Sequence, residues 1–403
     1  MKKCFQPAEL MLPAAGGFDK WAVIACDQFT SDRAYWDRVE NFVGDAPSTL
    51  RLVLPEIYLE ENAADRIAQI AKNMAAYEEN GAFKAYPNSF VYVERTLLDG
   101  SIRPGLVGMI DLEQYHYDPS KKPAIGATEQ TVLERIPPRI AVRREAAIEF
   151  PHVILFCNDE KDMIVEPIRQ KKEQLPKLYD FMLMENGGHI AGWLISGVDA
   201  AQLEKSIATY LDAAHGSALL VADGNHSLVT AKCWYEELKE KNPGVDLSNH
   251  PARYALVELE NILDPSVVFE PIHRVLFEID PEALLADLNA ISVPTGAPVE
   301  WVIGQRKGVI NLDVPKGELT VSVLQKFLDQ WLADHGGKID YIHDTDAVEK
   351  LAEQANTIGL LLPVFDKSEL FAFGASGKIL PRKTFSLGHG REKRYYLEGR
   401  RIK

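Results

Sequence analysis

The sequence has few cysteines and no long apolar run. Four cysteines are spread over 403 residues, and no two of them form a C-x-x-C pair. This spacing excludes a disulfide scaffold and argues against a zinc ribbon or a thioredoxin-like motif. No apolar stretch approaches the roughly 18 residues of a membrane span, and the first residues lack the apolar core of a signal peptide. We therefore expect a cytoplasmic protein with no membrane partner.

Positive charge is also scarce. Lys and Arg total 44 against 59 Asp and Glu, which gives a formal net charge of −15. Nucleic-acid binding requires a basic face that neutralises phosphates. The basic residues cluster only locally, at 135–144 and 391–401. Such clusters in an acidic protein fit a small anionic ligand better than a duplex, so we expect a small-molecule substrate or a nucleotide and no nucleic acid.

Three common catalytic motifs are missing. The chain contains no H-E-x-x-H, no G-x-x-x-x-G-K-[ST] and no G-x-S-x-G. Their absence argues against a zincin-type metal site, a P-loop enzyme and an α/β-hydrolase. The composition is that of an ordinary globular protein, with 46% hydrophobic and 26% charged residues. A chain of this length predicts two or three folding units.

Apolar periodicity predicts alternating strands and helices along most of the chain. Asp99-Gly100 lies between two strands and predicts a hairpin. The alternation favours an α/β, or mixed α+β, fold with a mixed sheet. We expect helices over 33–42, 63–79, 175–185, 200–215, 226–241, 281–289, 322–335 and 347–356 (the last capped by Asp346), and strands over 21–26, 50–54, 90–98, 106–112, 152–157, 190–195, 218–222, 254–259, 309–314, 339–343 and 357–362.

The same pattern divides the chain into three regions. Residues 1–115 form an N-terminal α/β region, 116–279 a core region and 280–403 a C-terminal α/β region. Whether these regions pack as one or two domains is open. The last basic stretch, 391–396, is expected to be a solvated tail or a closing strand.

The segment 222–227, Ala-Asp-Gly-Asn-His-Ser, lies where a strand meets a helix and is the best candidate for chemistry. Gly224 lets a ligand approach the main chain, and the helix N-terminus favours an anion such as phosphate. His226 and Ser227 add donors. Asp223 is able to hold Mg²⁺ or to accept a proton. The alternative is an ordinary turn with Asn225 as the helix N-cap.

Other candidates lie outside this segment. Asp27 ends the first expected strand, a common place for functional groups in α/β folds, although a polar turn fits it as well. Glu129 with Arg135 or Arg139 fits a carboxylate base beside phosphate-binding cations, or a structural ion pair. Lys383 is able to reach a phosphate, or is simply solvated.

Four sequence segments resemble one family. The string Val221–Ala231, which contains Ala-Asp-Gly-Asn-His-Ser, resembles the "ADGHHR…A" signature of the bacterial domain of unknown function 1015 family. Residues 128–131 resemble its "HE-x-T" segment, 271–274 its "PTHR" and 381–385 its "P-x-K-[ST]-[TF]" stretch. That family is similar to the ParB/sulfiredoxin superfamily, which includes free serine kinases. The resemblance therefore implies a ParB/sulfiredoxin-like core with a nucleotide-binding site.

The resemblance also implies an activity. We expect a phosphotransferase that acts on a small hydroxylated metabolite such as free serine, with Mg²⁺ and ATP or ADP as cofactors. Asp223 is the expected metal ligand. The expected catalytic residues are His226, Asp223, Glu129 and Asp27, and the expected cofactor-binding residues are Gly224, Asn225, His226, Ser227, Arg135, Arg139, His273, Arg274 and Lys383.

Two departures from the family pattern leave alternatives open. Ser227 stands where the family usually has an Arg, and a serine cannot clamp a phosphate through two parallel hydrogen bonds. Asn225 stands where the sulfiredoxin relatives place a catalytic Cys, so thiol chemistry is not expected. His273 also fits a satisfied core histidine. The alternatives are a ParB-like nucleotide-binding regulator with little or no turnover, and a structural or partner-binding protein with a degenerate site.

Overall fold

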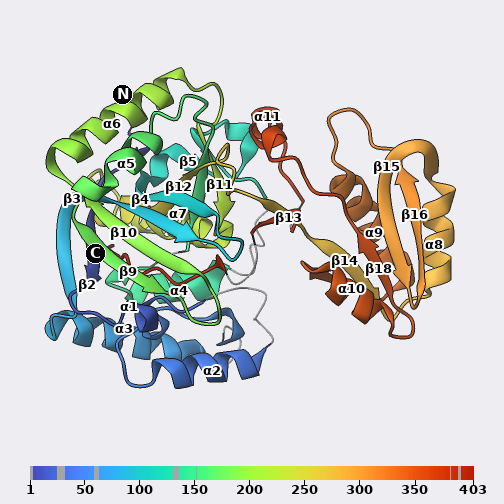
Figure 1. Cartoon of the computed structure of the whole chain (residues 1–403), viewed down its shortest axis with the longest axis horizontal. Coiled ribbons are helices and arrows are strands. Elements are labelled where there is room, and N and C mark those ends of the chain that lie inside the picture. Colours follow the sequence, from blue (N-terminus) through green and yellow to red (C-terminus); the bar gives the residue numbers. More distant parts are fainter. Residues whose placement is uncertain are drawn as a thin grey trace. The chain divides into compact units, whose positions relative to one another are not determined.

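The computed structural model describes residues 3–24, 32–58, 63–129, 136–150, 152–381, 383–388 and 392–403 (Figure 1). The chain divides into two compact units. The first unit contains Met1–Val267, Gly374–Gly377 and Gly390–Lys403, and the second contains Val268–Phe373 and Lys378–His389. The three regions expected from the sequence stay a prediction, and the border between the compact units lies at Val267.

A mixed sheet is the centre of the first unit. Its main path has the order β5-β6-β11-β8-β12-β4-β3-β10-β9, with β1 on β4 and β2 on β3. β8 pairs parallel with β12 and antiparallel with β11, so the predicted mixed α/β fold is confirmed. The strands are β1 (Phe5–Gln6), β2 (Ala8–Pro13), β3 (Phe83–Thr96), β4 (Ile102–Asp111), β5 (Tyr115–His116), β6 (Ile125–Gly126), β8 (Ile154–Cys157), β9 (Lys177–Met182), β10 (His189–Ile195), β11 (Leu219–Asp223) and β12 (Tyr254–Asn261).

Amphipathic helices surround this sheet (Figure 1). In α6 the buried residues Ala200, Leu203, Ile207 and Tyr210 recur every three or four positions, which places them on one face. A separate pair of short strands, β7 (Ile148–Glu149) and β20 (Arg400–Arg401), ties the end of the chain to the first unit. The α-helices are α1 (Phe18–Trp21), α2 (Arg33–Val43), α3 (Ala63–Glu79), α4 (Ile136–Glu145), α5 (Glu166–Lys171), α6 (Gly197–Ala213) and α7 (Asn225–Lys241).

Most sequence-predicted elements of the first unit are confirmed, and three are wrong. The strand expected over 21–26 does not form in its described part, because Trp21 ends α1 and Ile24 makes only an isolated bridge with Arg394. The hairpin at Asp99-Gly100 joins β3 to β4, with Thr96 opposite Ile102. The strand expected over 50–54 is wrong, because Thr49–Arg51 form a 3₁₀ turn that the Ser48 side chain caps. The helix expected over 175–185 is also wrong, because this segment pairs with β10 as β9. Cross-strand pairing decided the structure of a segment whose local pattern fits either state.

The second unit is built on a five-stranded sheet with the order β16-β15-β18-β14-β17. Its main core cluster contains Leu284 and Leu288 of α8, Leu324 and Leu328 of α9, and Leu360 of β18. The elements are β13 (Phe269–Pro271), β14 (His273–Phe277), α8 (Pro281–Ala290), β15 (Ser292–Ile303), β16 (Arg306–Leu312), α9 (Thr320–His335), β17 (Lys338–Ile342), α10 (Thr345–Ala352), β18 (Ile358–Leu361), α11 (Leu370–Ala375, which ends in the first unit) and β19 (Phe385–Leu387).

One helix start in the second unit differs from the expectation. Asp344, not Asp346, caps α10, because the Asp344 side chain accepts a hydrogen bond from the Asp346 backbone N–H. The helix therefore begins two residues earlier than the sequence pattern indicates. As for membranes, none of the helices in the described ranges is both long enough and apolar enough to span a bilayer.

Candidate functional site

The turn between β11 and α7 is shaped by Gly224. This residue is the N-cap of α7 and has a left-handed backbone (φ 81°, ψ 25°). A Cβ at this position would collide with the His152 carbonyl oxygen and lie 2.9 Å from the Val153 Cα. Only glycine satisfies both the backbone angle and the close packing. Asn225 is the first helical residue rather than the N-cap, and no side chain caps this helix start.

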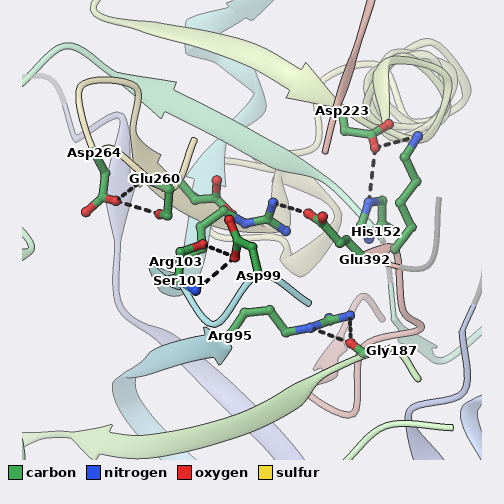
Figure 2. Close-up of polar contacts among 12 residues, drawn as sticks. Arg95, Asp99, Ser101, Arg103, His152, Gly187, Asp223, Glu260, Asp264 and Glu392 are labelled. Atoms are coloured by element: carbon green, nitrogen blue, oxygen red, sulfur yellow. Dashed lines mark hydrogen bonds and ion pairs between the residues drawn. The ribbon is translucent and has the colours of Figure 1, made fainter. Parts of the chain in front are cut away.

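Asp223, the last residue of β11, is held by two side chains from distant parts of the sequence (Figure 2). Its Oδ2 lies 3.0 Å from Lys393 Nζ and 3.3 Å from His152 Nε2, while its Oδ1 accepts a 2.7 Å hydrogen bond from the Gly224 N–H. Burial acts to raise the pKa of Asp223, but Lys393 and His152 outweigh it and hold that pKa well below its ordinary value. The carboxyl group is therefore ionised at neutral pH.

His152 and Lys393 are site residues that the sequence reasoning missed. His152 precedes β8, and Lys393 lies in the stretch expected to be a solvated tail or a closing strand. The solvated alternative is wrong, because Glu392, Arg394 and Tyr396 are all buried. A run of charged residues next to tyrosines has the same local pattern on a surface as against a sheet, so the sequence carries no signal that separates the two.

Two buried polar atoms at this turn have no hydrogen-bond partner among the described residues. They are His152 Nδ1 and Asn225 Oδ1. The His152 ring packs against Tyr396, with the ring centroids 5.5 Å apart, which fixes its orientation. Unsatisfied buried polar atoms are rare in folded proteins, and each calls for a water or a ligand. The turn thus has one free acceptor and one further histidine nitrogen.

A pocket of about 180 Å³ adjoins the first turns of α7. Ser227 and Thr230 line it from α7, and Arg139 and Arg143 line it from α4. The structure thus brings together Ser227 and Arg139, two of the expected cofactor-binding residues. The two arginines are four residues apart on one helix, so they lie on the same face. The remaining wall is mainly apolar and includes Leu52, Val53, Leu54, Met74, Val142, Ala146, Ile148, Phe150 and Ile402.

Of the described residues, Glu149 is the one carboxylate that lines the pocket, and it is already paired. Its Oε2 lies 2.7 Å from Arg143, and its Oε1 accepts hydrogen bonds from Arg400 and from the Leu256 N–H. Burial acts to raise the pKa of Glu149, but Arg143 and Arg400 lower it below the ordinary value. Arg143 also lies over the Trp234 ring, 5.3 Å from its centroid. Among the described residues that line the pocket, two arginines thus stand beside one carboxylate.

The other expected residues of the first unit lie near β11 or outside the described residues. Glu129 follows Thr128, whose Oγ1 donates a 2.7 Å hydrogen bond to the Val221 carbonyl, so Glu129 lies at the same end of β11 as Asp223. The His226 carbonyl accepts a hydrogen bond from Thr230 Oγ1 within α7. Asp27 and Arg135 fall outside the described part of the chain. Their expected roles stay predictions.

The expected residues His273, Arg274 and Lys383 belong to the second unit. His273 Nδ1 accepts from the Leu362 N–H, and burial followed by the charge of Arg274 lowers the pKa of His273 to about 4. Arg274 is fully buried, and it donates to the carbonyls of Ile272 and Lys383 and to Gln325 Oε1. These contacts give both side chains a part in holding the second unit together. Their expected role in cofactor binding stays a prediction.

The described residues contain no group of three or more His, Cys, Asp or Glu side chains that is able to hold a metal ion. Asp223, the expected metal ligand, already pairs with Lys393. Mg²⁺ in proteins is often held by one or two carboxylates together with substrate phosphates. A lone carboxylate fits that arrangement only when phosphates supply the other ligands and Lys393 moves away from Asp223.

Comparisons with solved structures found distant likenesses. The chain is similar to a free serine kinase in complex with AMP, with a TM-score of 0.37 and 12% identity, covering 69% of this chain and 86% of that chain. It is also similar to a conserved hypothetical protein from Pyrococcus furiosus (TM-score 0.35, 12% identity, 69% and 89% covered). A third likeness is to SbnI with a C-terminal truncation from Staphylococcus aureus (TM-score 0.37, 10% identity, 70% and 81% covered).

Curated proteins gave no match. A family profile described as "Protein of unknown function (DUF1015)" matches residues 8–363. The match covers most of the chain and includes three of the four segments that resemble the family. The chain therefore belongs to the DUF1015 family.

Proposed function

We propose that the chain binds the phosphate groups of a nucleotide at the Asp223–Ser227 turn and in the adjoining pocket, and that it transfers a phosphoryl group to a small hydroxylated metabolite. The observation that carries this proposal is the meeting of Ser227 and Arg139 in one pocket at the start of α7. The unpartnered Asn225 Oδ1 and His152 Nδ1 nearby add polar groups for a ligand.

The phosphate end of the ligand lies at the start of α7 in this proposal. A 17-residue helix without a side-chain cap offers backbone N–H groups and the positive end of its dipole. The family pattern usually has an Arg where this chain has Ser227. Arg139 of α4 lines the same pocket, so it supplies a guanidinium in place of the family's Arg that is absent at position 227. Ser227 then contributes a hydroxyl donor.

The apolar wall of the pocket suits the nucleoside end. Leu52, Leu54, Met74 and Phe150 line the same pocket as Arg139. Ligand pockets are commonly apolar with a few well-placed polar groups, and a nucleobase on such a wall with phosphates at the charged end fits that pattern. Ile402 closes the wall, so the end of the chain takes part in the pocket.

Asp223 and Glu129 are the proposed carboxylates for the acceptor hydroxyl. Asp223 is ionised because Lys393 and His152 outweigh its burial, and Glu129 lies at the same end of β11. When bound, Mg²⁺ would neutralise charge on the phosphates, with Asp223 as the carboxylate that holds it. Free serine is the first acceptor to test, because the family that these segments resemble is similar to a superfamily that includes free serine kinases.

One observation favours a second candidate, a nucleotide-binding regulator without turnover. Lys393 Nζ lies 3.0 Å from Asp223 Oδ2 and neutralises the carboxylate that the transfer reaction would use. A site in this state binds phosphates, but its Asp223 is not free to act as a base. The two candidates share the pocket and differ in whether Asp223 becomes available.

Nucleotide binding is tested with ADP and ATP, each with and without Mg²⁺, through thermal stabilisation. A nucleotide at a hundred times its Kd adds about 2.7 kcal/mol to the free energy of unfolding. Arg139→Gln is expected to weaken binding about 10- to 100-fold, because a hydrogen bond to a charged group contributes about 1.5–3 kcal/mol.

Arg144→Gln is the matched control for Arg139→Gln. It removes a guanidinium from the same helix, but Arg144 pairs with Glu237 at the surface and lies outside the pocket lining. Its affinity should equal that of the unmodified protein. No stabilisation with any of these nucleotides would contradict both the kinase and the regulator. Equal losses in the two variants would show that the pocket is not the phosphate site.

Turnover separates the two candidates. The kinase predicts a phosphorylated product when the chain is incubated with nucleotide, Mg²⁺ and free serine, as read by mass spectrometry. Asp223→Asn should reduce the rate about 100-fold or more, because general acid–base groups contribute about 10²- to 10⁴-fold. The affinity for ADP without Mg²⁺ should change much less. Tight binding with no product from serine or from a panel of small alcohols would favour the regulator.

A further inference from the structure

Residues 392–398 run across the large sheet of the first unit and are named here the latch segment. Its side chains reach four different strands. Glu392 pairs with Arg103 of β4, Lys393 with Asp223 of β11, Tyr396 with Glu258 of β12, and Glu398 with Tyr179 of β9. The Tyr395 N–H donates to the Val23 carbonyl over 2.9 Å. The segment that holds Asp223 is thus fastened to the sheet by buried polar contacts.

The sheet face beneath the latch segment carries several charged side chains. Arg95 and Arg103 lie directly opposite each other on β3 and β4, and Glu258 and Glu260 point to the same face of β12 because they are two residues apart. A Cβ on Gly105 would lie 2.8 Å from the Glu258 Cδ, so this glycine makes room for the carboxylate. Apolar residues at these positions would pack without the desolvation cost that buried charges incur.

One guanidinium on this face is shared by two carboxylates (Figure 2). Arg103 Nε lies 3.3 Å from Glu260 Oε1, and Arg103 Nη1 lies 2.8 Å from Glu392 Oε2. Glu260 is 1% exposed, and its Oε2 has no hydrogen-bond partner among the described residues. Two ionised carboxylates are one too many for a single buried arginine, so the arrangement fits one proton on Glu260.

The surroundings of Glu260 favour that proton. Burial has the largest effect, and it raises the pKa of Glu260 to about 8 against the opposing charge of Arg103. Several further groups face it, namely Glu258 on its own strand, Glu392 from the latch segment, Asp264 from the loop after β12, Arg95 beside Arg103, and Tyr396, whose hydroxyl donates to Glu258. The three carboxylates among these groups raise the pKa further.

We propose that Glu260, Arg103 and Glu392 form a proton-dependent latch that keeps Lys393 on Asp223. With the proton present, Arg103 pairs with Glu392 without competition and the latch segment is closed. Without it, Glu260 competes for Arg103, Glu392 is released, and the adjacent Lys393 leaves Asp223. The link from an open latch to ligand binding rests on the proposed function, whereas the opening itself does not.

The direction of the pH effect follows from linkage. In the closed state Glu260 keeps its proton up to about pH 8, and in an open, solvated state it loses the proton near its ordinary pKa of 4.5. The closed state is therefore favoured most at low pH. The equilibrium constant that favours the closed state over the open state falls by up to tenfold per pH unit between pH 4.5 and pH 8. Above pH 8 it is constant.

Hydrogen exchange at the Tyr395 and Gly399 amides measures the opening directly. The Gly399 N–H, directly after the latch segment, donates to the Met11 carbonyl, so we expect both amides to exchange only when the latch segment and Gly399 detach from their partners. We expect the exchange rate, divided by the intrinsic rate at each pH, to rise about 10- to 100-fold between pH 6 and pH 8. Glu260→Gln, which resembles the protonated acid, should remove this rise and keep the amides protected.

Two further variants control the measurement. Glu237→Gln changes a surface carboxylate whose pKa Arg144 and Lys241 lower to about 2, so its profile should match the unmodified protein. Glu392→Gln removes the carboxylate that Arg103 holds in the closed state, so the amides should exchange faster at low pH and the rise with pH should be smaller. This second variant tests the latch even if Glu260→Gln fails to fold. Protection that does not depend on pH, or a rise that persists in Glu260→Gln, would overturn the proposal.

ADP titration at pH 6.5 and pH 8.5 separates the latch from the proposed function. If both hold, the unmodified protein binds ADP with Mg²⁺ more tightly at pH 8.5, because Asp223 is then free to hold the metal, and Glu260→Gln shows no such gain. If the amides open with pH but ADP binds at neither pH, the latch stands and the proposed function fails. If ADP binds equally at both pH values while the amides open, the coupling to Asp223 is overturned.

Discussion

Gly224→Ala is expected to lower the free energy of unfolding by about 2–5 kcal/mol and to abolish nucleotide binding. The left-handed backbone of Gly224 costs a residue with a Cβ about 1–2 kcal/mol. The new Cβ also collides with the His152 carbonyl and lies 2.9 Å from the Val153 Cα. Both neighbours are backbone atoms that cannot rotate away, so β11 or the segment before β8 must shift, which adds about 1–3 kcal/mol.

Gly244→Ala is the matched control for this substitution. Gly244 has a similar backbone (φ 84°), but a Cβ there has no atom within 4 Å. It should lose only the conformational contribution, about 1–2 kcal/mol, and keep its affinity for ADP. Chemical denaturation of both variants gives the comparison. Equal losses in the two variants would mean that the packing of Gly224 against His152 and Val153 is not what requires a glycine.

Arg274→Met is expected to destabilise the second unit by about 3–5 kcal/mol. Arg274 is fully buried, and it donates to the carbonyls of Ile272 and Lys383 and to Gln325 Oε1. Methionine fills much of the space but donates nothing. Each buried acceptor left without a donor costs about 1–3 kcal/mol. Its guanidinium also lies 4.8 Å from the Tyr341 ring centroid, a contact that the variant loses in part.

Arg306→Met controls for the loss of a positive charge in the same unit. Arg306 is exposed and pairs with Glu282, and exposed ion pairs contribute about 0–1 kcal/mol. Because the chain has two compact units, unfolding is best followed by calorimetry, which resolves separate transitions. A loss of ADP affinity in Arg274→Met with the stability of the second unit unchanged would give Arg274 the cofactor-binding role instead of the structural one.

Periodicity and turn chemistry predicted the long helices and the hairpin well, because these depend on residues close in sequence. The spacing of apolar residues in α3, α6 and α9 fits a helix buried on one face. The segment at 177–182 was different. Its structure depends on β10, which pairs with it residue by residue, and a local pattern contains no information about that partner.

The candidate site shows the same division. The turn at 222–227 could be located from sequence, because a glycine between a strand and a helix has a local signature. The partners of Asp223 could not. His152 lies 71 residues before it and Lys393 lies 170 residues after it, and only the folded sheet brings the three together. Arg139 reaches the pocket of Ser227 because α4 packs against α7.

The sequence by itself determined the family, the mixed α/β class and the position of the glycine turn, since these rest on motifs and on spacing along the chain. Tertiary structure alone decided which charges meet. The stretch after residue 391 has the composition of a solvated tail, yet Glu392 and Arg394 are buried on a sheet face that offers Arg103 and Glu258. Burial of a charge depends on a partner that compensates its desolvation, and that partner is supplied by the fold.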